Sequence, residues 1–439
     1  MCDLLESGWR RFWLRSAFLF FGDWELGGVR GEFRRESSRN PRVWVVFISS
    51  LPMYTRGMAD ASLRILLMDG ELTFRGSSLL TLRIARGLER REFETALVCT
   101  GCSGLDESLL RGVRLHEIPG YSVPLWGRLV LRTIYRDLKE QRPDVIHLQD
   151  SRLLVQGSIL ARKLNRPLIL SLWDQSEASG LVLRKPIPQL RMIISVSASV
   201  QSEIPNLPAL AGVGRRVILP GVELPESGVG VVPLEEVRPP VIGMAGPLEV
   251  VKGADYFLRA CHRVVEAGHD IRVVIAGSGP EERGLRQLAG SLGLSSRLTF
   301  VDGGVSMQGY LSAIDIFCLP SLQQGLGVLM LEAMALGRPV IASGVGGITS
   351  VIEDRVNGLI VPPRDSGRLS EGMIELLSQR AFARGLALAG QELVRSRFSE
   401  GRMLEELISV YRDAALTVDR AAESAPVPGR TSVTVRERL

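Results

Sequence analysis

The sequence lacks the features that mark membrane-spanning and metal-holding chains. Its apolar runs, at residues 18–21 and 43–48, are far shorter than the roughly 20 residues that a membrane-spanning helix needs. Five cysteines occur in 439 residues, and their scattered positions are typical of a chain from a reducing cytoplasm. Cys99 and Cys102 form a CxxC, and because no second CxxC follows, we interpret both as packing thiols rather than zinc ligands.

Two further scarcities narrow the function. Aromatic residues make up 6% of the chain, which gives little support to the stacking platforms of nucleic-acid-binding proteins. No Asp-x-Asp pair occurs, so a carboxylate clamp that holds a metal ion on a diphosphate is not expected. We therefore expect neither a nucleic-acid partner nor a bound metal.

The chain does contain enough apolar material for two domains, with 45% hydrophobic and 23% charged residues. Its charge is uneven: 22 Lys and Arg stand against 15 Asp and Glu in residues 61–220, and 11 against 16 in residues 221–365. A basic first half suits an anionic membrane surface or an anionic acceptor. A solvated surface of mixed charge is the alternative.

The most informative stretch runs from Cys318 to Gly347. Its pattern predicts a strand, a glycine-bearing loop, a helix over Val328–Leu336 that is closed by Gly337, and a further strand. In a parallel sheet this order places the helix N-terminus at the carboxyl edge of the strands. Because a helix N-terminus has unpaired N–H groups and a positive dipole end, this one suits a phosphate group.

The loop and the helix supply candidate donor-site residues. Gly325 and Gly327 leave room for a ligand to approach the backbone, with Leu326 and Val328 beside them. Glu332, about one turn into the helix, has room to accept hydrogen bonds from a sugar diol. The alternative is an ordinary turn before a core helix, because a lone G-x-G turn is common.

The same stretch fits a longer pattern. It reads PS-x3-G-x-G-x4-EAMA-x-G-x-PV followed by Gly-Val-Gly-Gly, and it resembles the donor-site motif of the family 4 glycosyltransferases, retaining enzymes with the GT-B fold. The resemblance extends over about residues 62–417. It implies an α/β fold with two Rossmann-like domains, whose parallel sheets face each other across a cleft. It also implies a nucleotide sugar held by the second domain.

Composition and resemblance together divide the chain. Residues 1–60 keep no helix or strand period for long, so we expect a poorly ordered extension, with Met53 or Met58 as a natural start just before the first strand. Whether residues 1–57 are translated stays open. The expected divisions are a poorly ordered extension over 1–60, an acceptor domain over 61–223, a linker over 224–239, a donor domain over 240–400, a crossover helix onto the first domain over 401–417 and a disordered tail over 418–439.

In the first half, a buried strand over Arg64–Met68 and a helix over Leu79–Leu88 flank a turn. The resemblance places Gly76 and Ser77 of that turn near the donor. A basic amphipathic helix is predicted over residues 124–141, which is a candidate membrane-surface patch. An ordinary solvated helix face is the alternative there.

Trp173 and Asp174 follow a strand predicted over Pro167–Leu172, which delivers them to the acceptor side of the cleft. Many members of the resembled family carry a histidine at the position of Trp173. Tryptophan does not titrate, and it offers only an N–H and a flat apolar face. This is the first departure from the family pattern.

The second half holds the residues assigned to the diphosphate. The family places an arginine just after Gly246 and a lysine before the next helix; here Pro247 stands for the arginine and Lys252 matches the lysine. Only 4 of the 53 basic residues are lysines, so we interpret the compact ammonium group of Lys252 as selected for this turn. The alternative is that a lysine stands here by chance. The resemblance also assigns to the donor a G-x-GP turn, formed by Gly277, Gly279 and Pro280.

The third departure is Gln324, because the family's E-x7-E motif has its first glutamate there, eight residues before Glu332. Glutamine binds sugar hydroxyls but places no negative charge near an oxocarbenium-like centre. Losing a charged hydrogen bond costs about 1.5–3 kcal/mol, roughly ten- to a hundredfold in affinity or rate. Arg338 is one arginine that would compensate for Pro247 if it reached the site. We assign Lys252, Gln324 and Glu332 to the reaction centre.

The expected function is sugar transfer from a UDP-, GDP- or ADP-linked donor to a glycan, lipid or small-molecule acceptor, as in polysaccharide biosynthesis. The resemblance implies retention of configuration, no metal ion and no cofactor besides the nucleotide sugar. We expect a cytoplasmic enzyme. A second form of this prediction adds peripheral contact with the inner face of the membrane. Two alternatives stay open: a catalytically weak or inactive GT-B protein that acts as a binding subunit, and a nucleotide-sugar epimerase.

Overall fold

The computed structural model divides the chain into two compact units, Met1–Ala61 and Ser62–Leu439. Of residues 23–26, 29–35, 44–50 and 417–423 it describes the backbone alone. No helix of the described part is long and apolar enough to cross a membrane. The residues that the structure describes are 23–26, 29–35, 44–50, 63–73, 76–102, 105, 110–120, 135, 142–224, 234, 238–301 and 306–423.

The first unit contains a three-stranded antiparallel sheet in the order β1-β2-β3. Its strands are β1 (Asp23–Leu26), β2 (Val29–Arg35) and β3 (Trp44–Ser50). The β-branched and aromatic residues of β3, which reads WVVFISS, favour an extended backbone. The poorly ordered extension expected over residues 1–60 stays a prediction. The rest of the predicted extension lies outside the described residues.

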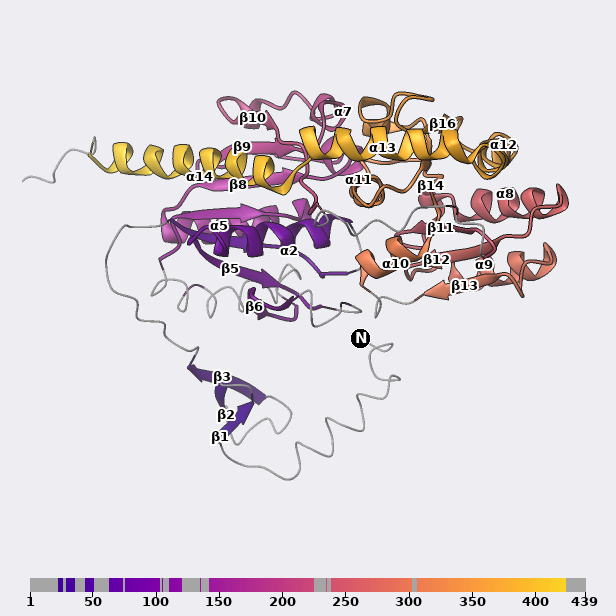
Figure 1. The fold of residues 1–439 in the computed structure, drawn as a ribbon. Coiled ribbons are helices and arrows are strands. Elements are labelled where there is room, and N and C mark those ends of the chain that lie inside the picture. The colour runs from indigo at the N-terminus through magenta and orange to yellow at the C-terminus, as the bar shows by residue number, and fades with distance from the viewer. Residues whose placement is uncertain are drawn as a thin grey trace, which may run out of the picture. The chain divides into compact units, whose positions relative to one another are not determined.

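Seven parallel strands form the first sheet of the larger unit, in the order β10-β9-β8-β7-β4-β5-β6 (Figure 1). The central strands are mostly apolar and almost wholly buried, as expected for strands that are covered on both faces. The order reverses between β4 and β7, which places a crevice at their carboxyl ends. The strands are β4 (Arg64–Met68), β5 (Glu94–Cys99), β6 (Arg114–Glu117), β7 (Val145–Leu148), β8 (Leu168–Leu172), β9 (Leu190–Ser195) and β10 (Gly214–Val217), and the helices are α2 (Gly76–Glu89), α5 (Leu154–Leu164), α6 (Gln175–Ser179) and α7 (Ala198–Ser202).

Six parallel strands form the second sheet, in the order β13-β12-β11-β14-β15-β16. Here the order reverses between β11 and β14, so the loops after these two strands meet at one edge. The strands are β11 (Val241–Ala245), β12 (Arg272–Ala276), β13 (Leu298–Val301), β14 (Ile316–Leu319), β15 (Val340–Ser343) and β16 (Leu359–Val361), and the helices are α8 (Ala254–Glu266), α9 (Glu282–Ser291), α10 (Met307–Ala313), α11 (Val328–Ala335), α12 (Ser366–Ser378) and α13 (Arg380–Arg397).

The last helix, α14 (Glu400–Glu423), follows the second half in the chain but packs against α2, β7 and β9 of the first. Figure 1 shows α13 and α14 end to end, with α14 beside the strands of the first sheet. A buried hydrogen bond anchors it, because the Tyr411 hydroxyl lies 2.8 Å from Nδ1 of His147 on β7. Nε2 of the same imidazole lies 2.8 Å from the hydroxyl of Ser171.

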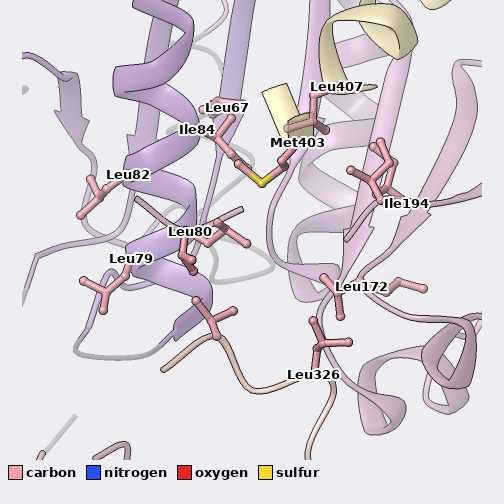
Figure 2. Close-up of a cluster of buried hydrophobic side chains, with 14 of the residues drawn as sticks. Leu67, Leu79, Leu80, Leu82, Ile84, Leu172, Ile194, Leu326, Met403 and Leu407 are labelled. Atoms are coloured by element: carbon pink, nitrogen blue, oxygen red, sulfur yellow. The ribbon is translucent and has the colours of Figure 1, made fainter. Parts of the chain in front are cut away.

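The hydrophobic core of the first half extends into the second. Figure 2 shows Leu326, from the loop before α11, beside Leu172 of β8, with Leu80 of α2 in the same cluster. All three side chains are buried, and they belong to one apolar cluster that also contains Met403 of α14. Burying this cluster favours the contact between the halves at the loop that carries the donor-site motif.

One local prediction differs from the structure. Helix α2 begins at Gly76 rather than Leu79, so Gly76 and Ser77 form its first turn instead of a preceding loop. Serine tolerates a helix start well, because its hydroxyl satisfies backbone groups there, and nothing in this segment breaks a helix before Leu79. The predicted basic helix over residues 124–141 lies outside the described residues, except at Tyr135.

Candidate functional site

A cavity of about 340 Å³ lies between the two halves of the larger unit, where the carboxyl ends of both sheets meet. The first half contributes the start of α2 and the segment after β8. The second half contributes the loops after β11 and β14 and the start of α11. The predicted site residues on its wall are Gly76, Ser77, Trp173, Asp174, Gly246, Lys252, Gln324, Gly325, Leu326, Gly327 and Val328, and Pro247 lies there too.

Two helices point their N-termini into this cavity. Gly327 and Val328 open α11, and Gly76 and Ser77 open α2. Gly327 has a left-handed backbone with φ of 92°, and no side chain caps α11. The free N–H groups of its first turn therefore face the cavity, with the positive end of the helix dipole behind them. This arrangement can bind an anion such as a diphosphate.

The start of α2 lies directly against the start of α11. A Cβ atom added to Gly76 would lie 3.1 Å from Cβ of Val328, which is tighter than ordinary van der Waals contact. Glycine at position 76 therefore lets the two helices approach this closely.

Lys252 is the cationic side chain among the described residues that line the cavity. It ends the 3-10 turn η4 (Val250–Lys252), and its Nζ donates a hydrogen bond to Oε1 of Gln324 over 3.0 Å. The Ser321 hydroxyl donates to the same oxygen over 3.4 Å. The contact joins two residues that are 72 positions apart in the sequence, and both were assigned to the reaction centre.

The indole ring of Trp173 is held in a fixed position on the cavity wall. Its Nε1–H donates to the backbone oxygen of Gln149 over 2.6 Å, and its backbone N–H donates to Oε2 of Glu177 over 2.8 Å. The indole N–H is therefore engaged within the protein, and the apolar ring remains for a ligand.

Asp174 caps α6, since its Oδ1 accepts hydrogen bonds from the backbone N–H of Glu177 and from the Ser176 hydroxyl, at 2.9 and 2.6 Å. Its carboxylate thus has a structural role besides its place on the cavity wall. Gln175 and Ser176 lie on the same wall, and the sequence offered no motif for either.

Two buried carboxyl groups of the first half have raised pKa values. Burial raises the pKa of Glu177 to about 8, although the hydrogen bond from the Trp173 N–H opposes the rise. Burial also raises the pKa of Asp69, which follows β4, to about 6, against the hydrogen bonds from Thr81 and Gly70. The sequence analysis missed both. The position of Asp69 at the carboxyl end of a central strand was the available signal.

Three residues predicted to contact the donor are not among those that line the cavity, namely Gly277, Gly279 and Pro280. The two glycines instead let their turn pack on the loop after β11. A Cβ atom at Gly277 would lie 2.0 Å from the backbone oxygen of Gly246, and one at Gly279 would lie 2.5 Å from that of Leu248. They support the loop that carries Lys252, and their predicted contact with a donor stays a prediction.

Glu332 also lies off the cavity wall, one turn beyond Val328 on α11. Its Oε1 lies 2.7 Å from a guanidinium nitrogen of Arg83 on α2, and about a tenth of each side chain is exposed. Sequence reasoning missed Arg83. The available signal was an arginine in the middle of an apolar helix face, beside Leu79, Leu80 and Leu82.

Arg338 does not reach the place of the arginine that Pro247 replaces. It lies directly before β15, at the amino edge of the second sheet, whereas the cavity lies at the carboxyl edge. Its guanidinium is buried and donates to the backbone oxygen of Ser312 over 3.2 Å. The compensation considered for Arg338 is therefore wrong. Within the described residues, no group of three or more His, Cys, Asp and Glu side chains is arranged to hold a metal ion.

Two family models match the chain. One, described as Glycosyltransferase Family 4, matches residues 74–224, and the other, described as Glycosyl transferases group 1, matches residues 239–379. An uncharacterised glycosyltransferase of Methanocaldococcus jannaschii is 26% identical over 362 residues, which cover 75% of this chain and 92% of that protein. The D-inositol 3-phosphate glycosyltransferase of Mycolicibacterium smegmatis is 26% identical over 359 residues, covering 79% and 78%.

A solved structure has the same fold. The structure of HepE from Anabaena in complex with UDP-glucose superposes with a TM-score of 0.66 at 20% sequence identity. The match covers 80% of this chain and 100% of HepE. Both Rossmann-like halves are therefore shared with that protein.

Proposed function

Because this chain belongs to the family 4 glycosyltransferases and has their GT-B fold, we propose that it transfers a sugar from a nucleotide-sugar donor to an acceptor hydroxyl with retention of configuration. The observation that carries this proposal is the cavity between the halves, where two helix N-termini and Lys252 converge. HepE binds UDP-glucose, which supports a nucleotide sugar as the donor.

In this proposal the donor diphosphate binds at the start of α11, against the free N–H groups of Gly327 and Val328. Lys252 supplies the positive charge. As the bond to the sugar breaks, negative charge grows on the leaving diphosphate, and preorganised dipoles and a fixed cation stabilise that charge. We propose that these groups suffice without a metal ion or any cofactor besides the nucleotide sugar.

The departures at Pro247 and Gln324 compensate for each other electrostatically. The family pattern of arginine, lysine and glutamate has a net charge of +1 at these three positions. Pro247, Lys252 and Gln324 also have a net charge of +1. Because Lys252 donates to a neutral amide, this contact does not cancel its charge. The equal net charge of the two sets supports an active transferase. Each departure considered by itself instead supports the alternative, a catalytically weak or inactive binding subunit.

The acceptor is proposed to bind on the first half. The fixed indole of Trp173 offers an apolar face, and Asp174, Gln175 and Ser176 offer polar atoms beside it. A sugar ring suits such a wall, because its C–H face packs on an aromatic ring while its hydroxyls form hydrogen bonds. We propose a glycan, lipid-linked or small-molecule acceptor of this kind, used in the cytoplasm at or near the inner face of a membrane.

The test is a binding and turnover scan with UDP, GDP and ADP and their glucose conjugates, by calorimetry and by chromatography of the products. One nucleotide should bind, and its conjugate should be slowly hydrolysed or transferred. Lys252→Ala should weaken that binding about ten- to a hundredfold, because a charged hydrogen bond to phosphate is lost. Lys185→Ala removes an equal charge from an exposed position outside the cavity and should change nothing.

Each other outcome of the scan points to one alternative. Binding without turnover of any conjugate favours the binding subunit. Conversion of the free nucleotide sugar into another favours an epimerase. If no nucleotide binds, or if both lysine variants bind as the wild type does, the proposed donor site is wrong.

A further inference from the structure

The ion pair between Arg83 and Glu332 joins the two halves beside the cavity. Arg83 lies in the second turn of α2, and Glu332 lies in the second turn of α11, so the two helices that start at the cavity are tied together. A second guanidinium nitrogen of Arg83 donates to the backbone oxygen of Gly221 over 3.1 Å. The planar guanidinium is thus held at two points, which fixes its orientation.

Glu332 is the charged residue of a helix that is otherwise apolar and wholly buried, VLMLEAMA. A buried carboxylate is costly unless it is paired, and in the described part of the chain its partner is Arg83. Contact between the halves does not require this pair, because an apolar pair of similar volume is often as stabilising or more so. The surrounding side chains, including Leu326, already supply such an apolar contact. The carboxylate therefore points to a use other than packing.

The geometry leaves part of that carboxylate for a ligand. Arg83 bonds Oε1, and a carboxylate has about four lone-pair sites on its two oxygens. Val328, one turn before Glu332, lines the cavity. A nucleotide whose diphosphate binds at the start of α11 would bring its ribose toward this turn of the helix.

We propose that Arg83 is a positioning residue for donor binding: it holds the Glu332 carboxylate, charged and correctly oriented, for the 2′- and 3′-hydroxyls of the donor ribose. This inference rests on the proposed function. Arg83 itself does not touch the nucleotide, so a residue of the first half sets the affinity of a ligand bound by the second. The anchoring contact to Gly221, directly before the chain leaves the first half, gives the first half this influence.

The test compares the nucleoside diphosphate selected by the donor scan with its 2′,3′-dideoxy analogue, by calorimetry. The wild type should prefer the natural nucleotide tenfold or more. Arg83→Met should reduce this preference to about twofold or less while retaining affinity for the dideoxy analogue. Arg83→Lys, which keeps the charge, should restore part of the preference. A purely structural pair would affect both nucleotides equally.

Arg90→Met is the matched control, because Arg90 lies directly after the same helix and pairs with Glu400 at the surface of α14. It should keep the wild-type preference. If Arg83→Met does not fold, Arg83→Gln, which keeps hydrogen-bond donors but not the charge, should show the same reduced preference.

An unchanged preference in the Arg83 variants, with nucleotide bound by the wild type, would overturn this inference and leave the proposed function standing. If the wild type binds no nucleoside diphosphate, both are wrong.

Discussion

At the scale of single residues, the charge of the donor cavity depends on very few side chains. Lys252 supplies positive charge, and its partner Gln324 is neutral where a glutamate is expected from the family pattern. Asp174 and Glu249 lie on the same wall, so any added carboxylate makes the cavity less favourable for a diphosphate. The identity of residue 324 should therefore affect donor binding strongly.

Gln324→Glu should weaken binding of the nucleoside diphosphate about tenfold, because the new carboxylate neutralises Lys252 and repels the phosphates. Adding Pro247→Arg to it should restore affinity, since the net charge returns to its original value. Calorimetry measures both. Gln323→Glu is the control, because it adds the same charge to the same loop without the contact to Lys252, and its effect should be smaller. A higher turnover in Gln324→Glu would instead support a weakened enzyme.

At the scale of elements, local pattern was enough to predict the strand, loop and helix that carry the donor motif. Helix α11 starts at Val328, as the glycine-bearing loop before it indicated. The start of α2 was missed by three residues because Gly-Ser-Ser is compatible with a turn as well as with a helix start. Pattern alone did not show that α2 and α11 would meet.

The loop before α11 lies against the end of β8, and Gly325 is the point of closest approach. A Cβ atom at this position would lie 2.0 Å from the backbone oxygen of Trp173. Gly325→Ala should therefore push the loop off the first half, destabilise the protein by about 1–3 kcal/mol and weaken nucleotide binding. Urea unfolding and calorimetry test this.

The control for that variant is Gly385→Ala on α13, where an added Cβ meets nothing within 4 Å. Alanine favours a helix more than glycine does, so this variant should be neutral or more stable by up to about 1 kcal/mol. Equal behaviour of the two variants would show that the loop does not depend on a close approach at Gly325.

At the scale of the whole molecule, α14 returns to the first half, so the stability of the first half depends on this C-terminal helix. His147 of β7 and Tyr411 of α14 form the buried polar link. Burial lowers the pKa of His147 to about 3. An unfolded chain binds a proton at this residue below about pH 6.5, whereas the folded protein does not until near pH 3. Stability should therefore fall as the pH is lowered from about 6.5 toward 3.

His147→Gln should remove this part of the acid sensitivity. Between pH 7.5 and 4.5 the variant should lose about 2–3 kcal/mol less of its free energy of unfolding than the wild type does, measured by urea denaturation at both pH values. His262→Gln, on the surface of α8, is the control and should keep the wild-type dependence. Parallel pH profiles for the wild type and His147→Gln would contradict the assignment.

The two sheets and most residues of the donor-site wall could be predicted, because each is marked by a pattern of consecutive residues and by the resemblance to the family 4 glycosyltransferases. The pairs that complete the site could not. Arg83 and Glu332 are 249 positions apart, and Lys252 and Gln324 are 72 apart. The first pair joins the two halves and the second lies within the second half. Such contacts arise only when segments far apart in the sequence meet in the folded protein, and local periodicity carries no information about that meeting. The raised pKa of Glu177 has the same origin, since it depends on three-dimensional burial.

The central claim is that a nucleoside diphosphate binds at the start of α11, and the most direct test is a structure of the protein with the nucleotide that the donor scan selects. The account predicts phosphate oxygens within about 3.2 Å of the backbone N–H groups around Val328 and of the Lys252 ammonium, with the ribose hydroxyls at Glu332. A diphosphate bound elsewhere, or a saturated protein whose cavity at Val328 holds no nucleotide, would contradict it.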